Sequence, residues 1–130
     1  MAKSTSLRLV VLETPLTICK VADAGCVDLS TIAAPVFFAR TEDEISLVCP
    51  ADSAPAAELC VASEDGWRAL RVSGTLDFSL TGIIAGISSV LAGSGVPVFC
   101  VSTFDTDYVL VKEDRLAEAL CVLDAAGYIL

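Results

Sequence analysis

A strand–turn–strand pattern occurs twice in this chain, about half a chain length apart. Residues 35–41 read PVFFART and residues 97–103 read PVFCVST, with four identities at seven positions. A short acidic turn and a second apolar run follow each copy, at 45–48 and 108–111, when one residue of slack is allowed in the turn. Chance similarity between short strands rich in Val and Phe is the alternative. Because the turns also correspond, we interpret the pattern as a duplication, which predicts two related halves with a site between them.

The second half of the chain has the element order strand–helix–strand–strand–helix–strand. Apolar residues recur at helical spacing from Ser79 to about Ala92, and again from Glu113 to Ala126, where acidic residues occupy the first turn. Short apolar runs predict the strands, at 67–73, 98–102, 108–111 and 128–130. This order predicts a ferredoxin-like unit, in which an antiparallel sheet is covered by two helices on one face.

The first half repeats this order in a reduced form. A short helix is predicted to open at Asp28, and one or two helical turns are predicted after Pro55. Its strands are predicted at 16–21, 36–41 and 45–49, with a further strand candidate at 7–12. The last strand of this half and the first strand of the next compete for residues 67–73, and the sequence alone leaves that conflict open.

The fold class predicted from this order is α+β, with two ferredoxin-like βαββαβ units whose antiparallel sheets carry helices on one face. The reduced unit is expected at residues 1–65 and the complete one at residues 66–130. At 130 residues the length suits one domain, or two very small modules that share a core. The 55% share of hydrophobic residues is enough to form that core.

The net charge limits the macromolecular partners. The chain carries 17 acidic and 8 basic residues, for a formal charge of −9. A nucleic acid or an anionic membrane surface requires a basic face, so we expect neither as a partner.

No secretory signal is predicted, because the N-terminal residues do not combine a basic start, an apolar segment and a small-residue cleavage site. Residues 78–104 carry no charge, but the sequence GSGVP at 93–97 interrupts them. We interpret this stretch as a buried helix that runs into a buried strand rather than as a bilayer span. The expected location is the cytoplasm.

Six cysteines and the absence of histidine limit the metal chemistry. No two cysteines are spaced C-x-x-C, so neither a structural zinc site nor any cofactor is predicted. Cys19, Cys49 and Cys100 fall within apolar strand runs and are expected in the core. Cys26 and Cys60 are expected to be the more exposed thiols, and disulfides are not expected in a cytosolic protein.

An enzymatic function is disfavoured. Without histidine, neither a Ser-His-Asp nor a Cys-His arrangement can form. No glycine-rich loop has the G-x-G-x-x-G or P-loop spacing that a nucleotide site requires. A catalytic Cys thiolate needs an electropositive neighbourhood, which an acidic chain rarely supplies. The chain is therefore expected to bind rather than to catalyse.

Two polar loops are predicted at the same end of the second-half sheet. One precedes a helix, where free backbone N–H groups suit a carboxylate. The other joins two strands and offers carboxylates to an ammonium or guanidinium group. The first comprises Thr75, Leu76, Asp77, Phe78, Ser79, Leu80, Thr81 and Gly82, and the second Thr103, Phe104, Asp105, Thr106 and Asp107. Since an amino acid carries both charges, the two loops together predict an amino-acid site.

Each residue of these loops also has a purely structural explanation. Asp77 and Ser79 are suitable helix caps, and residues 105–107 are suitable for a turn. The prediction of a ligand site rests on the combination of the two loops.

Residues 101–111, VSTFDTDYVLV, resemble the ACT-domain proteins of the CASTOR-like group. Members of that group carry a signature of the type Ile-Ser-Thr-Phe-x-x-Asp-Tyr-Ile-Leu-Val in a tandem ACT arrangement. Supporting matches occur in order along the chain, at 16–20, 47–50, 67–72 and 74–82.

The resemblance implies a regulatory module that binds an amino acid, which is arginine in the eukaryotic cytosolic sensors of the group. The ligand is expected between the first strand and first helix of an ACT unit, at an interface with a second unit. On this chain those positions are 75–82 and Ser102–Thr106. The first half carries Arg40 to Glu44 at the corresponding turn, so the resemblance implies a degenerate first half and a functional second half. It also implies a homodimer that rebuilds the full arrangement.

Asp105 or Asp107 is thus predicted to bind the cationic end of an amino acid, with N–H groups around Ser79–Thr81 holding its carboxylate. The alternative is a structural interaction module that forms a dimer without a ligand and leaves the acidic loops solvated. A third possibility is a thiol sensor acting through Cys26 or Cys60.

Overall fold

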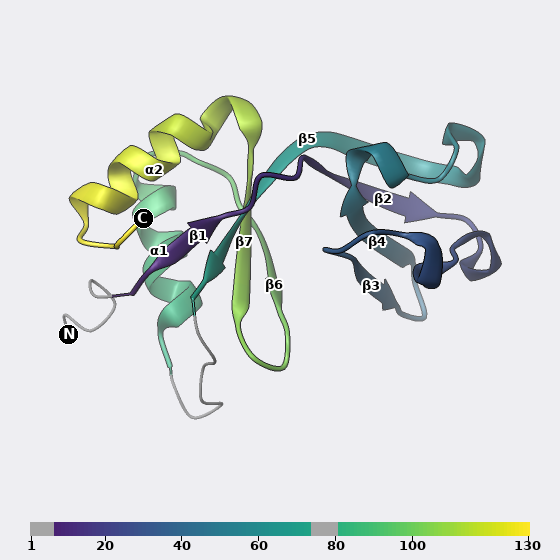
Figure 1. Cartoon of the computed structure of the whole chain (residues 1–130), viewed down its shortest axis with the longest axis horizontal. Coiled ribbons are helices and arrows are strands. Elements are labelled where there is room, and N and C mark those ends of the chain that lie inside the picture. Colours follow the sequence, from purple (N-terminus) through teal and green to yellow (C-terminus); the bar gives the residue numbers. More distant parts are fainter. Residues whose placement is uncertain (1–6, 74–80) are drawn as a thin grey trace. The chain divides into compact units, whose positions relative to one another are not determined.

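The chain divides into two compact units, and its computed structural model describes residues 7–73 and 81–130. Unit 1 combines Met1–Glu13 with Arg68–Leu130, and unit 2 is Thr14–Trp67 (Figure 1). Unit 2 therefore interrupts unit 1 in sequence. This division differs from the expected 1–65 and 66–130, because residues 1–13 belong with the second half.

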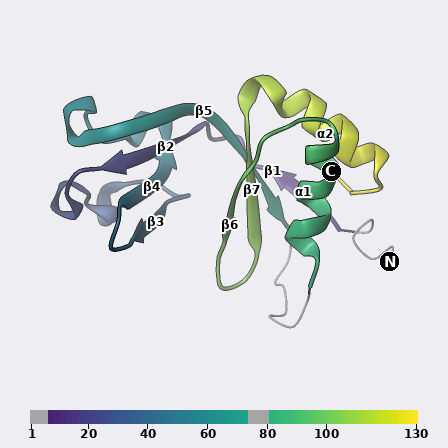
Figure 2. The ribbon, with the colours of Figure 1, turned by 180° about the vertical axis from the view of Figure 1, so that it is seen from behind.

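Unit 1 is a sheet with two α-helices on one face. Its strand order is β1–β5–β7–β6. Figure 2 shows α1 and α2 beside each other, and they contribute to one core with β1, β5 and β7. The elements are β1 (Leu9–Val11), β5 (Cys60–Val72), α1 (Ile83–Gly93), β6 (Phe99–Ser102), β7 (Asp107–Lys112), a 3₁₀ turn (Glu113–Arg115) and α2 (Leu116–Ala125).

The helix α1 forms where apolar residues recur at helical spacing, and it buries Ile87 and Leu91 completely. It ends because Gly95 adopts a φ of +73°, a left-handed conformation that favours glycine. The Gly95 N–H then donates to the Ala92 carbonyl at 2.9 Å. The described part of the uncharged stretch, from residue 81 to 104, is thus a helix followed by a strand. No helix in the described parts of the chain has the length and apolar character needed to cross a bilayer.

The N-terminal strand β1 belongs to the sheet of unit 1. It pairs antiparallel with β5, from Leu9 opposite Val72 to Val11 opposite Leu70. Residues 128–130 form only an isolated parallel bridge beside β1, in which the Leu9 N–H donates to the Ile129 carbonyl at 2.7 Å. The predicted terminal strand is therefore a single bridge.

Unit 2 has the sheet order β3–β4–β2–β5, and none of its residues is in an α-helix. Short 3₁₀ turns stand where a ferredoxin-like unit has helices, and two of them are capped locally by the Asp23 and Asp28 carboxylates. The elements are β2 (Leu16–Val21), β3 (Phe37–Arg40), β4 (Ile45–Pro50) and 3₁₀ turns at Ala24–Cys26, Leu29–Thr31, Ala51–Ser53 and Ala57–Leu59. The helical turns predicted after Pro55 are thus one 3₁₀ turn, followed directly by a strand.

One long strand resolves the competition for residues 67–73. The 13-residue strand β5 pairs with β2 over its first part, from Cys60 opposite Val21 to Trp67 opposite Leu16. Its last residues pair with β1. A single strand therefore completes unit 2 and continues into unit 1.

The two hairpins predicted from the repeat have the same register. Phe37 lies opposite Val48 in the hairpin of β3 and β4, and Phe99 lies opposite Leu110 in the hairpin of β6 and β7. Both hairpins span the same number of residues. The slack of one residue allowed in the sequence comparison is therefore wrong, because Asp107 is the first residue of β7 rather than part of the turn.

A threonine builds the turn in each hairpin. The Thr41 N–H donates to the Glu44 carbonyl at 2.9 Å, and the Thr103 N–H donates to the Thr106 carbonyl at 2.8 Å. The two threonine hydroxyls donate to the same carbonyls, at 3.3 and 3.2 Å. The shared threonine thus has one structural role in both copies.

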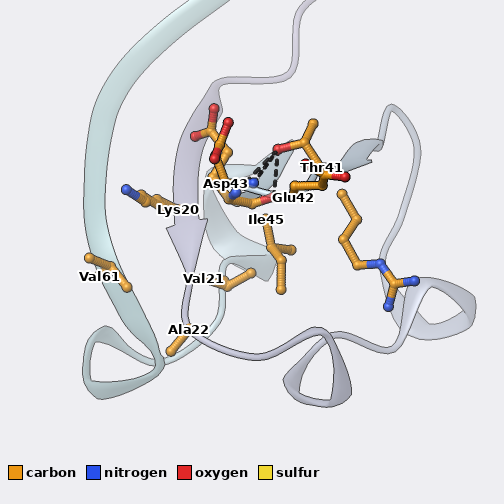
Figure 3. A pocket seen from close by; sticks show the side chains of 10 residues that line it. Lys20, Val21, Ala22, Thr41, Glu42, Asp43, Ile45 and Val61 are labelled. Carbon is orange, nitrogen blue, oxygen red and sulfur yellow. Dashed lines mark hydrogen bonds between the residues drawn. The ribbon is translucent and has the colours of Figure 1, made fainter.

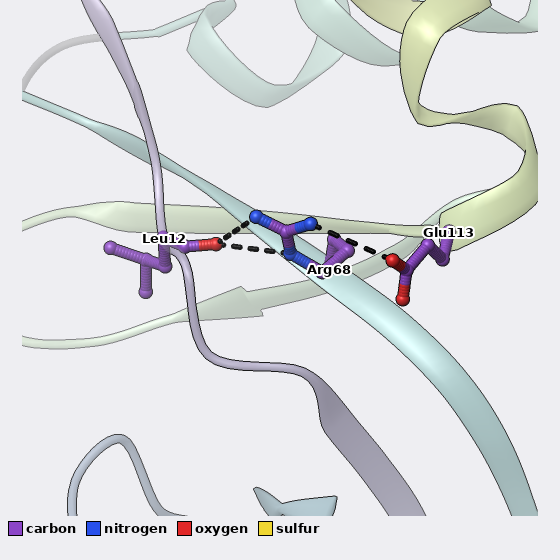
Figure 4. Close-up of polar contacts among 3 residues, drawn as sticks. All are labelled: Leu12, Arg68 and Glu113. Carbon is purple, nitrogen blue, oxygen red and sulfur yellow. Dashed lines mark hydrogen bonds and ion pairs between the residues drawn. The ribbon is translucent and has the colours of Figure 1, made fainter.

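Arg68 binds the backbone at Leu12, close to the point where the chain leaves unit 1 (Figure 4). Its Nε and Nη2 donate to the Leu12 carbonyl at 3.2 and 2.9 Å, and its Nη1 lies 3.9 Å from Glu113 Oε2. The Arg68 side chain is only 17% exposed, whereas that of Glu113 is 57% exposed. The paired hydrogen bonds are therefore expected to matter more for stability than the exposed ion pair.

We expect Arg68→Ala to lower the free energy of unfolding by about 1.5–3 kcal/mol, since it removes two charge-assisted hydrogen bonds from a mostly buried guanidinium to the Leu12 carbonyl. Arg71→Ala is the matched control, because Arg71 lies on the same strand and its side chain makes no hydrogen bond or ion pair with the described residues. Urea unfolding of both variants measures the difference. Equal losses would contradict the role assigned to Arg68.

Candidate functional site

The predicted turn of unit 1 is held together by its own side chains. Ser102 Oγ donates to Asp107 Oδ1 at 2.7 Å across the last pair of the hairpin. Thr106 is only 7% exposed, and its hydroxyl donates to the Val72 carbonyl at 2.6 Å. The structure thereby brings the turn of 103–106 beside the end of β5.

The described residues include only part of the first predicted loop. Thr75, Leu76, Asp77, Phe78, Ser79 and Leu80 lie outside them, so their predicted roles remain predictions. Thr81 is exposed, and Gly82 precedes α1 with a φ of +79°. The α-helix begins at Ile83, later than the predicted start at Ser79.

Within the turn of unit 1, the polar groups differ in what they offer a ligand. The hydroxyls of Ser102, Thr103 and Thr106 each donate inside the protein. The Asp107 carboxylate accepts one of these bonds. Asp105 is exposed and makes no polar contact with the described residues, and its neighbour Phe104 is 79% exposed. Asp105 is therefore the carboxylate of this turn that is best placed to meet a cation.

Unit 2 contains a pocket at the corresponding end of its own sheet. The pocket has a volume of about 360 Å³ and lies where β2 ends and the turn between β3 and β4 begins (Figure 3). It is lined by Lys20, Val21, Ala22, Arg40, Thr41, Glu42, Asp43, Glu44, Ile45 and Val61. The sequence prediction missed this site, because the charged residues at 40–44 were interpreted as a departure from the family pattern.

The pocket has an apolar base and a turn built by Thr41. Figure 3 shows Val21 and Ile45 between Val61 on one side and Thr41 on the other. Val21 is buried, whereas Val61 is 62% exposed. The Thr41 hydroxyl accepts from the backbone N–H groups of Asp43 and Glu44, both at 3.1 Å. These bonds fix the backbone that carries the acidic side chains.

Charges of both signs surround the pocket. Lys20 and Arg40 are exposed cations, and neither forms an ion pair with the described residues. The acidic side chains are those of Glu42, Asp43 and Glu44, also exposed. A small zwitterion matches this lining, because the cations suit its carboxylate and the acidic turn suits its ammonium group.

The sequence repeat could have located this pocket. Thr41 corresponds to Thr103, so the repeat places a second turn of the same kind in unit 2.

Three cysteines lie on the strands of the unit 2 sheet that carries this pocket. Cys19 and Cys49 are buried, as predicted, and Cys60 is partly buried. Cys100 is exposed, so its predicted core position is wrong; the strand β6 forms the edge of its sheet. Burial, followed by the neighbouring Cys60 thiol, raises the pKa of Cys19 from 9.0 to about 11.

The buried Cys19 thiol predicts a loss of stability at high pH. The unfolded chain releases this proton near pH 9, whereas the folded chain holds it to about pH 11, so the stabilisation is present below pH 9 and is lost through this window. We expect the unfolding free energy of Cys19→Ala to fall less over that window than that of the wild type. Urea unfolding below pH 9 and near pH 11 measures it. Cys26→Ala, at an exposed position, is the control; an equal change there would contradict the assignment.

Residues 62–125 match the ACT domain family. The chain contains an ACT domain. The matched residues run from within β5 to the end of α2, so they cover unit 1 except for residues 1–13 and 126–130, and they include residues 62–67 of unit 2. The resemblance found in the sequence is confirmed for the ACT domain itself.

Among curated relatives of this ACT-domain protein is the cytosolic arginine sensor for mTORC1 subunit 1. The rat protein (Rattus norvegicus) is 36% identical over 92 residues, which cover 67% of this chain and 27% of the relative. The human protein (Homo sapiens) is 34% identical over 91 residues, which cover 66% of this chain and 28% of the relative. The chain thus spans about a quarter of the length of these relatives.

Solved structures share the fold over nearly the whole chain. The protein Atu0741 from Agobacterium tumefaciens is 30% identical, with a TM-score of 0.83 and coverage of 96% of this chain and 92% of that one. Aspartate kinase from Clostridium acetobutylicum is 13% identical, with a TM-score of 0.68 and coverage of 92% and 34%. The second likeness concerns the fold alone.

Proposed function

We propose that this ACT-domain protein is a non-catalytic regulatory protein of the cytoplasm that binds an amino acid and works as a homodimer. The observation that carries the proposal is the pocket of about 360 Å³ in unit 2, which combines an apolar base with charges of both signs. Its place at the end of a strand and beside a hairpin turn is the place where the sequence predicts a ligand in unit 1.

The ligand class follows from the charges and from the relatives. A free amino acid presents a carboxylate to Lys20 and Arg40, and an ammonium group to the acidic turn at 42–44. In unit 1, Asp105 binds the cationic end, and the N–H groups around Ser79–Thr81 hold the carboxylate. The relatives are named as cytosolic arginine sensors, so arginine is the first ligand to test.

The proposed regulation depends on the two segments of unit 2 that a bound ligand would contact. A molecule in the unit 2 pocket contacts the end of β2 and the turn between β3 and β4 at once, so it favours conformations in which the two are held together. A partner surface that differs between these conformations then reports ligand occupancy. The tandem ACT arrangement is part of this proposal, and the order β3–β4–β2–β5 in unit 2 supports it, because it is the strand order of a ferredoxin-like unit.

A thermal-shift screen of the dialysed protein against the twenty amino acids tests the proposal. A ligand at 100 times its dissociation constant adds about 2.7 kcal/mol to the free energy of unfolding, so a selective, saturating rise in melting temperature is expected. A flat response, repeated after denaturing purification and refolding to remove any bound ligand, would favour the structural dimer module instead.

Substitutions distinguish a ligand site in unit 2 from one in unit 1. Arg40→Ala is expected to remove the response if the ligand occupies unit 2, and Asp105→Ala if it occupies unit 1. Asp124→Ala, an exposed acid on α2, is the matched control and should leave the response unchanged. If Arg40→Ala, Asp105→Ala and Asp77→Ala all bind as tightly as the wild type, both site assignments are wrong.

A further inference from the structure

Three of the six cysteines gather on one face of the unit 2 sheet. Cys19 on β2 and Cys49 on β4 belong to a small buried core, and Cys60 at the start of β5 packs against it. No group of three or more His, Cys, Asp or Glu side chains in the described residues has the arrangement of a metal site. Thiols that lie this close in one core can exchange with a disulfide and form a link to one another.

Cys19 and Cys60 lie on adjacent paired strands. Ser63 is directly opposite Cys19, and Cys60 is opposite Val21, after a shift of register between Lys20 and Val21. Cys60 packs against the core cluster that contains Cys19 and Val21, so both cysteine side chains lie on the same face of the sheet. Cys49 lies on β4, which pairs with the opposite edge of β2, so a strand separates it from Cys60. Burial first, and then the neighbouring Cys60 thiol, raise the pKa of Cys19, and the Cys60 Sγ lies 4.0 Å from the Pro55 carbonyl oxygen.

This thiol pair adjoins the pocket. Val21, opposite Cys60, and Val61, the next residue after Cys60, both line it (Figure 3). Beyond them, the Ala22 N–H donates to the Leu59 carbonyl at 3.3 Å, a long hydrogen bond where β2 and β5 separate. A covalent link between these strands would act directly on one wall of the pocket.

We propose that Cys19 and Cys60 form a redox-active thiol pair, which closes into an intramolecular disulfide on exposure to a low-molecular-weight disulfide and thereby stiffens the pocket wall. The disulfide itself does not depend on any ligand. Its effect on amino-acid binding rests on the proposed function.

The exchange takes place in two balanced steps. The partly buried Cys60 loses its proton and attacks the small disulfide, which forms a mixed disulfide and releases one thiolate that takes up the proton. Cys19 then loses its proton and attacks the Cys60 sulfur, which forms the Cys19–Cys60 bond and releases the second small thiolate to take up that proton. Two protein thiols are oxidised, and one small disulfide is reduced to two thiols.

Mass spectrometry of the folded chain treated with oxidised glutathione tests the pairing. The monomer mass is expected to fall by about 2 Da, for two hydrogens lost, with no glutathione retained. Digestion after basic residues and after glutamate separates the candidate partners, because Glu58 lies between Cys49 and Cys60. A stable glutathione adduct on the wild type, a Cys49–Cys60 link or a link between chains would overturn the proposal.

Cysteine variants sharpen this test. Cys60→Ala is expected to abolish the mass loss, as is Cys19→Ala, and circular dichroism establishes that each is folded. Cys60 is only partly buried, so its variant provides the decisive measurement if Cys19→Ala fails to fold. Cys49→Ala and Cys26→Ala are the matched controls and should close the disulfide as the wild type does.

Amide hydrogen exchange tests the effect on the pocket. The Ala22 amide is expected to exchange more slowly in the oxidised protein, because the link holds its hydrogen bond to Leu59 closed. Unchanged exchange in a chain that carries the disulfide would overturn the stiffening. Neither measurement uses an amino acid, so a failure here is distinguishable from a failure of the proposed function.

Discussion

The constraint on which the rest of the structure depends is the shared strand β5. Each of its two parts needs hydrogen-bonding partners, and the chain supplies β2 for the first part and β1 for the second. Because β1 and β2 are consecutive in sequence, the chain must leave unit 1 and enter unit 2 between them. Arg68 lies at the same change of partner on β5, where its guanidinium binds the Leu12 carbonyl. Both sheets therefore depend on the register of one strand.

The duplicated hairpin explains why two positions in this ACT-domain protein are candidates for a ligand. Thr41 and Thr103 impose the same turn through the same backbone and hydroxyl hydrogen bonds. What differs is the chemistry that the turn carries. In unit 1 the last turn residue is the buried Thr106, tied to β5, whereas in unit 2 it is the exposed Glu44, which lines a pocket. The same backbone thus closes against its neighbouring strand in one unit and leaves a charged hollow in the other.

Local patterns in the sequence predicted much of this fold. The periodicity around Ile87 and in α2 identified both helices, and the repeat identified both hairpins. The errors occur where partners distant in sequence decide the outcome. The prediction began this strand at residue 67, yet β2 offers residues 60–65 an edge to pair with, so β5 begins at Cys60. The exposure of Cys100 depends on β6 being an edge strand, which its own apolar run does not reveal.

The sequence by itself determined the α+β class, the repeated turns, the absence of histidine chemistry and the resemblance to ACT domains, because each depends on residue types at short spacing. The tertiary structure decided which strand lies beside which. Strand pairing is a choice among distant partners, and it placed β1 in unit 1, extended β5 through both sheets and gathered three cysteines on one face. It also decided where a pocket lies, because a hollow requires side chains from β2, the β3–β4 turn and β5 to approach without filling the space between them.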